Sequence, residues 1–220
     1  MNPQDSQAIP MSGQSLSTGA INKTLRNTYI ALAMMIGVAM LSTVAAMAGG
    51  LYFNLPWFVD LVVFYGLMFA IFKFSRSAAG LGFAFLFCAY MGLRLAPFMA
   101  VLPGDLIASA AGLTAITFLG LSGYCLTTKK DFSFLGGFLV AGCFIIMGAV
   151  ILNIFMQIPA LHLAIMSAFV IFSCVGILYT TSAMVNGGET NYIVVAVSLF
   201  VHIYNLFMSL LSLLSAFSGD

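Results

Sequence analysis

The sequence predicts an all-α integral membrane protein in which seven helices cross the bilayer. Hydrophobic residues fill 62% of its 220 positions and charged residues only 6%, whereas soluble domains carry about 25% charged residues. The mean hydropathy is +1.13. The apolar residues fall into seven runs of bilayer length, and the charged residues cluster near the ends of these runs. A chain of this composition has too little polar surface to fold in water.

Each predicted span follows from its length and from the turn residues that bound it. A helix rises about 1.5 Å per residue and the hydrocarbon core is about 30 Å thick, so a span needs roughly 20 residues. Pairs such as Gly49-Gly50 and Pro103-Gly104 mark the breaks. The predicted spans cover residues 28–49, 56–73, 80–101, 105–126, 134–156, 160–183 and 192–216.

Two regions follow from this division. Residues 1–27 are rich in Ser, Gln, Asn and Gly and lack the apolar core of a signal peptide. They are predicted to form a disordered cytoplasmic tail. Residues 28–220 form one seven-helix transmembrane domain, because no composition shift divides them.

The orientation follows from the cations that flank the spans, since Lys and Arg near span ends stay on the cytoplasmic side. Seven spans with a cytoplasmic N-terminus put all of the flanking cations on one side, and the opposite loops contain no Lys or Arg. The cations are Lys23, Arg26, Lys73, Arg76, Lys129 and Lys130. The C-terminus is therefore predicted to lie outside.

Several function classes are disfavoured. A net charge of +1 and the lack of a dense basic run argue against nucleic-acid binding. The four cysteines stand singly in apolar stretches, so neither a metal site nor a cofactor is expected. The common motifs of hydrolases and phosphate-binding enzymes are absent from the sequence. We expect a protein that is not an enzyme.

The seventh span carries a polar stripe. Its members are three or four residues apart, which puts them on one helix face that should avoid lipid: Ser198, His202, Asn205, Ser209 and Ser212. Hydrogen bonding between helices explains the stripe and would make this helix a buried central post. Alternatively, His202 is a proton-sensitive switch in a polar pathway, because histidine ordinarily titrates near about pH 6.5.

Arg94 is the one cation inside a predicted span, roughly 10 Å of helix from the outer end of the third span. It can extend to the outer surface or pair with Asp60 or Asp105 near that surface. The functional alternative is a role in an ion path or gate.

Six short strings occur along the chain in a recognisable order. They are KTLRNTY at 23–29, YGLMF at 65–69, LTTKKD at 126–131, FLGG at 134–137, QIPALHLAI at 157–165 and GGETNYI at 187–193. Together they resemble the Bax inhibitor-1 (transmembrane BAX inhibitor motif) family, and more closely its bacterial YccA-like branch. The resemblance implies six helices surrounding a central seventh. It also implies a bacterial inner-membrane location.

The family resemblance implies two activities. Members of the wider family behave as pH-sensitive calcium leaks that use one aspartate on span six and one on span seven. This chain has Thr180 and His202 at those places, and this pair supplies neither carboxylate that calcium favours. The YccA-like branch is associated instead with the membrane-anchored AAA+ protease FtsH, as modulator and substrate.

The sequence therefore predicts a non-enzymatic inner-membrane protein that binds and modulates an FtsH-like protease through its helices. The N-terminal tail would supply the unstructured start that a processive protease needs. The alternative is a pH-sensitive cation (calcium) or proton leak lined by Arg94, Thr180, His202 and Asn205.

Overall fold

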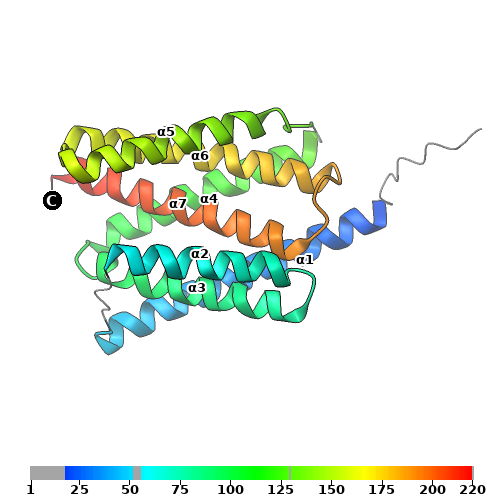
Figure 1. Cartoon of the computed structure of the whole chain (residues 1–220), viewed down its shortest axis with the longest axis horizontal. Coiled ribbons are helices and arrows are strands. Elements are labelled where there is room, and N and C mark those ends of the chain that lie inside the picture. Colours follow the sequence, from blue (N-terminus) through cyan, green and yellow to red (C-terminus); the bar gives the residue numbers. More distant parts are fainter. Residues whose placement is uncertain (1–17, 52–55, 129, 220) are drawn as a thin grey trace, which may run out of the picture.

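The computed structural model describes residues 18–51, 56–128 and 130–219, and this part of the chain is all-helical (Figure 1). The all-α prediction is confirmed. The described residues form seven helices: α1 (Thr18–Gly49), α2 (Trp57–Phe74), α3 (Ala78–Met99), α4 (Gly104–Thr128), α5 (Leu135–Met156), α6 (Pro159–Val185) and α7 (Tyr192–Ser218).

Local sequence explains where the last two helices begin and end. Pro159 occupies the first turn of α6, where a proline loses no helical hydrogen bond. The Asn191 side chain accepts a hydrogen bond from the Ile193 amide and caps the start of α7. Gly219 ends α7 in the left-handed conformation, with φ of 78°. The α6 and α7 boundaries lie within two residues of those predicted.

The first helix differs from the prediction, because it begins at Thr18 rather than at residue 28. The stretch 18–27 contains no proline, and Leu25 packs against the core. The Thr24 hydroxyl also donates to the Thr190 carbonyl oxygen, 3.5 Å away. These contacts stabilise extra helical turns over residues 18–27. The polar composition of these residues had predicted that they belong to the tail. The rest of the predicted tail, residues 1–17, lies outside the described residues.

Six helices of the described chain are long and apolar enough to cross a membrane, namely α1 and α3 to α7. The protein is therefore a multi-pass membrane protein. The remaining helix, α2, has 18 residues, or about 27 Å at 1.5 Å per residue.

The arrangement of the helices is uneven. Of the spans, α7 has the largest buried share, and it packs against α1, α3, α4 and α6. Helix α2 packs on α3, and α5 packs on α6 (Figure 1). Fully buried side chains of the core include Met35, Phe87, Ile177, Leu199 and Leu206. Helix α7 is thus the most buried of the spans, whereas α2 and α5 each pack mainly on one neighbouring helix.

Helices α1 and α3 approach each other closely at Gly92. The Thr43 hydroxyl of α1 donates to the Gly92 carbonyl oxygen at 2.9 Å. A Cβ atom on Gly92 would collide with the Ala39 carbonyl oxygen and the Ser42 hydroxyl. The absence of a side chain at Gly92 therefore sets the distance between these two helices.

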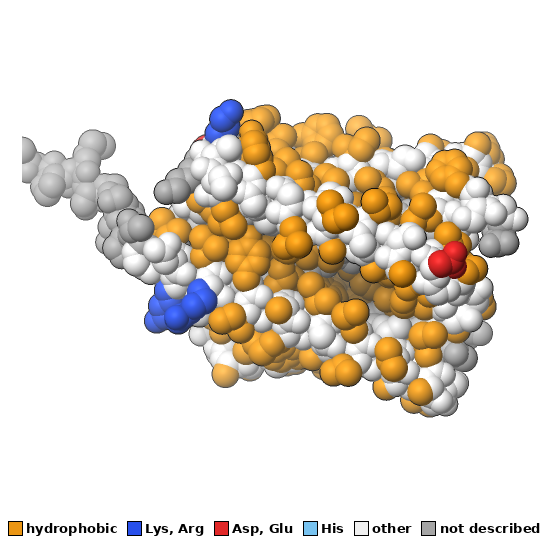
Figure 2. Space-filling view, turned by 180° about the vertical axis from the view of Figure 1, so that it is seen from behind, with side chains coloured by type: hydrophobic (Ala, Val, Ile, Leu, Met, Phe, Trp, Pro, Cys, Tyr) orange, Lys and Arg blue, Asp and Glu red, His pale blue; other side chains and the backbone are white. Residues whose placement is uncertain are grey.

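The flanking cations that the structure describes gather at one end of the bundle. That end is formed by the first turns of α1, the α2–α3 turn, the α4–α5 segment and the α6–α7 loop. Three hydrogen bonds tie these segments together, from Thr24 to Thr190, from Asn191 to Ser75 and from Ser182 to Lys130. Figure 2 shows the Lys and Arg side chains of one face at this end, with a largely hydrophobic surface beyond them.

Replacing Gly92 by alanine should lower the free energy of unfolding by about 1–3 kcal/mol, because the new methyl group meets backbone atoms of α1. Gly82→Ala in the same helix is the control. It has open space around its Cα and should be neutral or stabilising by up to about 1 kcal/mol. Reversible unfolding in mixed micelles measures both, and equal effects of the two variants would contradict the close α1–α3 contact.

Candidate functional site

The polar stripe of α7 faces α6. At one end of the interface Ser198 and Thr180 line the same cavity. At the other end, His162 Nε2 lies 3.3 Å from the Ser212 hydroxyl. The two helices run antiparallel, so polar or small residues of α6 meet the stripe at Ser198, His202 and Ser212.

His202 lies midway along this interface, directly against Gly176 of α6. A Cβ atom on Gly176 would occupy the place of the imidazole ring itself. The Phe172 ring lies 6.1 Å from the imidazole, centroid to centroid, at an interplanar angle of 55°. His202 Nδ1 is buried and has no hydrogen-bond partner within the described chain. Packing against Gly176 and Phe172 thus holds the imidazole in a slot on α6, and this slot exists because Gly176 has no side chain.

Asn205 and Thr180 lie one helical turn from this slot. The register that pairs His202 with Gly176 brings Asn205 level with Ser173, whose buried hydroxyl also has no hydrogen-bond partner among the described residues. Thr180 is 9% exposed. The structure therefore groups three of the predicted pathway residues along the α6–α7 interface.

Arg94 lies elsewhere, in an ion pair between α2 and α3. Its Nη2 atom is 2.7 Å from Asp60 Oδ2, and the two side chains are 29% and 26% exposed. The Tyr90 hydroxyl donates to the other oxygen of the same carboxylate. Asp60 therefore accepts from two donors of α3. Asp105, the second predicted partner, is exposed in the first turn of α4.

The Arg94 cluster and His202 are on different sides of α7. Tyr204, two residues after His202, faces α3 and its hydroxyl lies 3.5 Å from the Met91 carbonyl oxygen. Residues two apart on a helix point about 200° apart. His202 faces α6, and Arg94 belongs to the α2–α3 side. A single route lined by all four predicted residues remains a prediction.

The sequence did not predict a cavity that lies between α6 and α7, at the end of the bundle that is expected to face the cytoplasm. Asp131 and Glu189 contribute to it from the α4–α5 and α6–α7 segments. Asp131 follows Lys130 and Glu189 follows Gly188 in the sequence, a pattern that is typical of ordinary loop residues. Only the folded chain shows that these two loops meet. The part of the chain that the structure describes contains no group of three or more metal-ligating side chains.

Comparison with known proteins places this arrangement in a family. The family model described as "Inhibitor of apoptosis-promoting Bax1" matches residues 21–219. The chain belongs to the Bax inhibitor-1 family. The match covers α2 to α7 in full and α1 from residue 21, so it includes the α6–α7 interface and the Asp60–Arg94 pair.

Three bacterial relatives illustrate the range of similarity within the Bax inhibitor-1 family. An uncharacterized protein of Pseudomonas aeruginosa is 46% identical, covering 91% of this chain and 92% of its own length. The "Modulator of FtsH protease YccA" of Escherichia coli K12 is 43% identical, covering 90% and 92%. An "Uncharacterized membrane protein" of Vibrio cholerae is 40% identical, again covering 90% and 92%.

In this Bax inhibitor-1 family member, Gly176→Ala should lower the free energy of unfolding by about 1–3 kcal/mol, since the methyl group displaces the imidazole. The double variant with His202→Ala should lose less free energy of unfolding than the two single variants together, by about 1 kcal/mol or more, because the ring that clashes is gone. Unfolding in mixed micelles measures this double-mutant cycle.

The matched control for this cycle is Gly120→Ala in α4, where a Cβ atom meets open space. It should not be coupled to His202→Ala. Strictly additive effects at Gly176 and His202 would show that the slot does not hold the ring.

Proposed function

We propose that this protein is a non-enzymatic modulator of a membrane-anchored AAA+ protease of the FtsH type, located in the bacterial inner membrane. One observation carries the proposal: a relative that is 43% identical over 90% of the chain bears the name of a modulator of that protease. A relative from a second Escherichia coli strain is named an inner membrane protein.

The structure supports a binding role over a catalytic one. Three polar side chains within the spans make contacts between helices: Asp60 with Arg94, His202 with Gly176, and Thr43 with Gly92. None of these arrangements resembles a nucleophile with an adjacent base. The large exposed side chains of the described spans are apolar, with Phe69, Ile116 and Phe144 each more than two-thirds exposed. Such surfaces contact lipid or the helices of a partner.

The proposed topology has seven spans, with α2 crossing as the seventh, a cytoplasmic N-terminus and a periplasmic C-terminus. The gathering of the described flanking cations at one end of the bundle supports it. In this topology α7 is the central helix, with the other six around it. Its contacts with four helices and its large buried share support that position.

The alternative, a pH-sensitive cation or proton leak, is less well supported. Thr180 and His202 stand where the family's leak uses two aspartates. Arg94 is tied to Asp60 on another side of α7. A leak would require a route from the cavity at Thr180 past the His202 ring, which fills its slot against Gly176.

Affinity purification of the protein in mild detergent should recover the protease, both with the full chain and with a variant that starts at Thr18. The helices remain intact in that variant, so binding through them should persist. Only the full chain should be degraded when ATP is added, since residues 1–17 would supply the start for the protease. Immunoblotting of the protease and of the protein measures both effects.

An unrelated polytopic protein of similar size, purified in the same way, controls for co-extraction of membrane neighbours. Recovery of no protease with either form would overturn the proposal. Recovery of the protease with the full chain but not with the shortened variant would show that the protease binds the N-terminal tail rather than the helices.

A further inference from the structure

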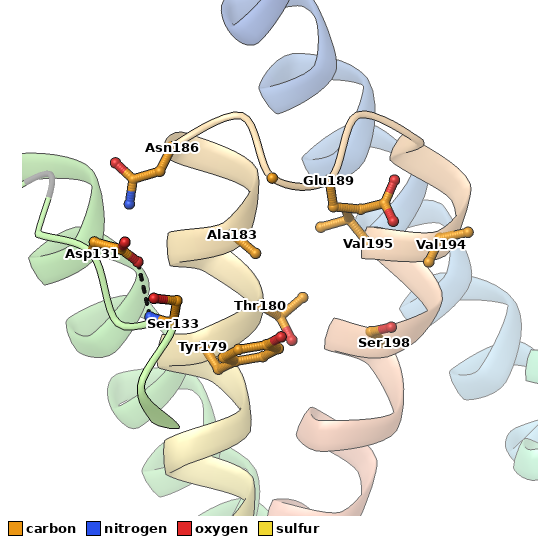
Figure 3. Close-up of a pocket in the computed structure, with 11 residues that line it drawn as sticks. Asp131, Ser133, Tyr179, Thr180, Ala183, Asn186, Glu189, Val194, Val195 and Ser198 are labelled. Atoms are coloured by element: carbon orange, nitrogen blue, oxygen red, sulfur yellow. Dashed lines mark hydrogen bonds between the residues drawn. The ribbon is translucent and has the colours of Figure 1, made fainter. Parts of the chain in front are cut away.

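The cavity between α6 and α7 has the composition of a ligand site. Its volume is about 450 Å³. It is lined by Asp131, Ser133, Tyr179, Thr180, Ala183, Asn186, Gly188, Glu189, Val194, Val195 and Ser198. Figure 3 shows Tyr179, Thr180, Glu189 and Ser198 on the side of α6 that faces α7, and Asp131, Ser133 and Asn186 on the side that faces the α4–α5 segment. The site lies at the end of the bundle, where water reaches it.

Hydroxyl groups without partners form the inner part of the cavity. Thr180 is more than nine-tenths buried, and its side chain points into the space between α6 and α7 (Figure 3). Its hydroxyl has no hydrogen-bond partner among the described residues, and the same holds for the hydroxyls of Tyr179 and Ser198. Each of these hydroxyl groups can donate a hydrogen bond to an occupant of the cavity or accept one from it.

Two carboxylates stand at the opening. Asp131 Oδ1 accepts from the Ser133 amide at 2.8 Å, and Glu189 Oε1 accepts from the Asn191 amide at 2.8 Å. These bonds fix both side chains and leave the second oxygen of each carboxylate for a ligand. No Lys or Arg in the described part of the chain lines the cavity. Although the flanking cations gather at the same end of the bundle, the charged side chains that line the cavity itself are Asp131 and Glu189, which favour a positively charged occupant.

The geometry favours an organic cation over a metal ion. Asp131 and Glu189 both line the cavity but come from different loops, and they lie on opposite sides of the α6 ribbon in Figure 3. The cavity is many times the roughly 30 Å³ that one water occupies. A chelated metal needs its ligands within about 2–2.6 Å of one point. A flexible chain with a cationic group at each end can follow the cavity from one carboxylate to the other.

We propose that this cavity binds an aliphatic polyamine, with one ammonium group at Asp131 and another at Glu189. An ammonium group donates three hydrogen bonds, which the carboxylates and the inner hydroxyls accept. The methylene groups lie against Ala183, Val194 and Val195. The Tyr179 ring offers a face that attracts a cation. This proposal does not depend on the proposed function.

Isothermal titration of the purified full-length protein with spermidine tests the proposal. Saturable binding is expected. Asp131→Asn and Glu189→Gln should each weaken it roughly tenfold, because each removes a charge-assisted hydrogen bond. Both variants keep the oxygen that accepts the amide hydrogen bond of the loop, so the loops should hold their conformation. Thr180→Val, which removes the inner hydroxyl and keeps the shape, should weaken binding several-fold.

Asp105→Asn is the matched control, since it removes an exposed carboxylate from the start of α4 and should leave spermidine binding unchanged. The neutral 1,4-butanediol should not bind. Lack of saturable spermidine binding would overturn the proposal. So would binding that survives both carboxylate changes, or Mg²⁺ binding to the same groups more tightly than spermidine. Failure here would leave protease association intact, so the two proposals are separable.

Discussion

The contact between α6 and α7 is the interaction on which the rest of the structure depends. A polar side chain within a bilayer has no water to bond with, so its partner must come from the protein. The stripe of α7 turns toward a single neighbouring helix: Ser212 lies within hydrogen-bond distance of His162, whereas His202 packs against Gly176 and its Nδ1 atom has no hydrogen-bond partner among the described residues. Because the stripe is covered by α6, the apolar faces of α7 are left to pack on α1, α3 and α4.

Two charged side chains within the spans form an ion pair away from the α6–α7 interface. Arg94 and Asp60 neutralise each other between α2 and α3, and Tyr90 adds a donor to the same carboxylate. This pair attaches α2, the shortest of the described helices, to the helix that carries Gly92. The Gly92 contact in turn joins α3 to α1. Specific polar or close contacts thus join α1 to α3, α2 to α3 and α6 to α7.

Much of this fold was predictable, because span length and apolar composition depend on neighbouring residues in the sequence. The α7 stripe was visible for the same reason, as its members repeat with the helical period. The predicted start of α1 was wrong, because its first turns are stabilised by residues that are distant in the sequence: Thr24 bonds to the α6–α7 loop and Leu25 packs against the core. The role of Gly176 could not be seen either, because it depends on a histidine that folding brings opposite it. Asp131 and Glu189 share a cavity only because two loops meet.

Together these features describe a protein whose intramembrane polar groups serve mainly to assemble helices and whose outer surface is available to lipid or to partner helices. Modulation of a protease by such a surface is most directly tested in liposomes that hold both proteins and a second, unrelated membrane substrate. If the proposal is correct, substrate degradation slows as more of the protein is added, and the variant that begins at Thr18 slows it equally. A degradation rate that does not change with the amount of either form would contradict it.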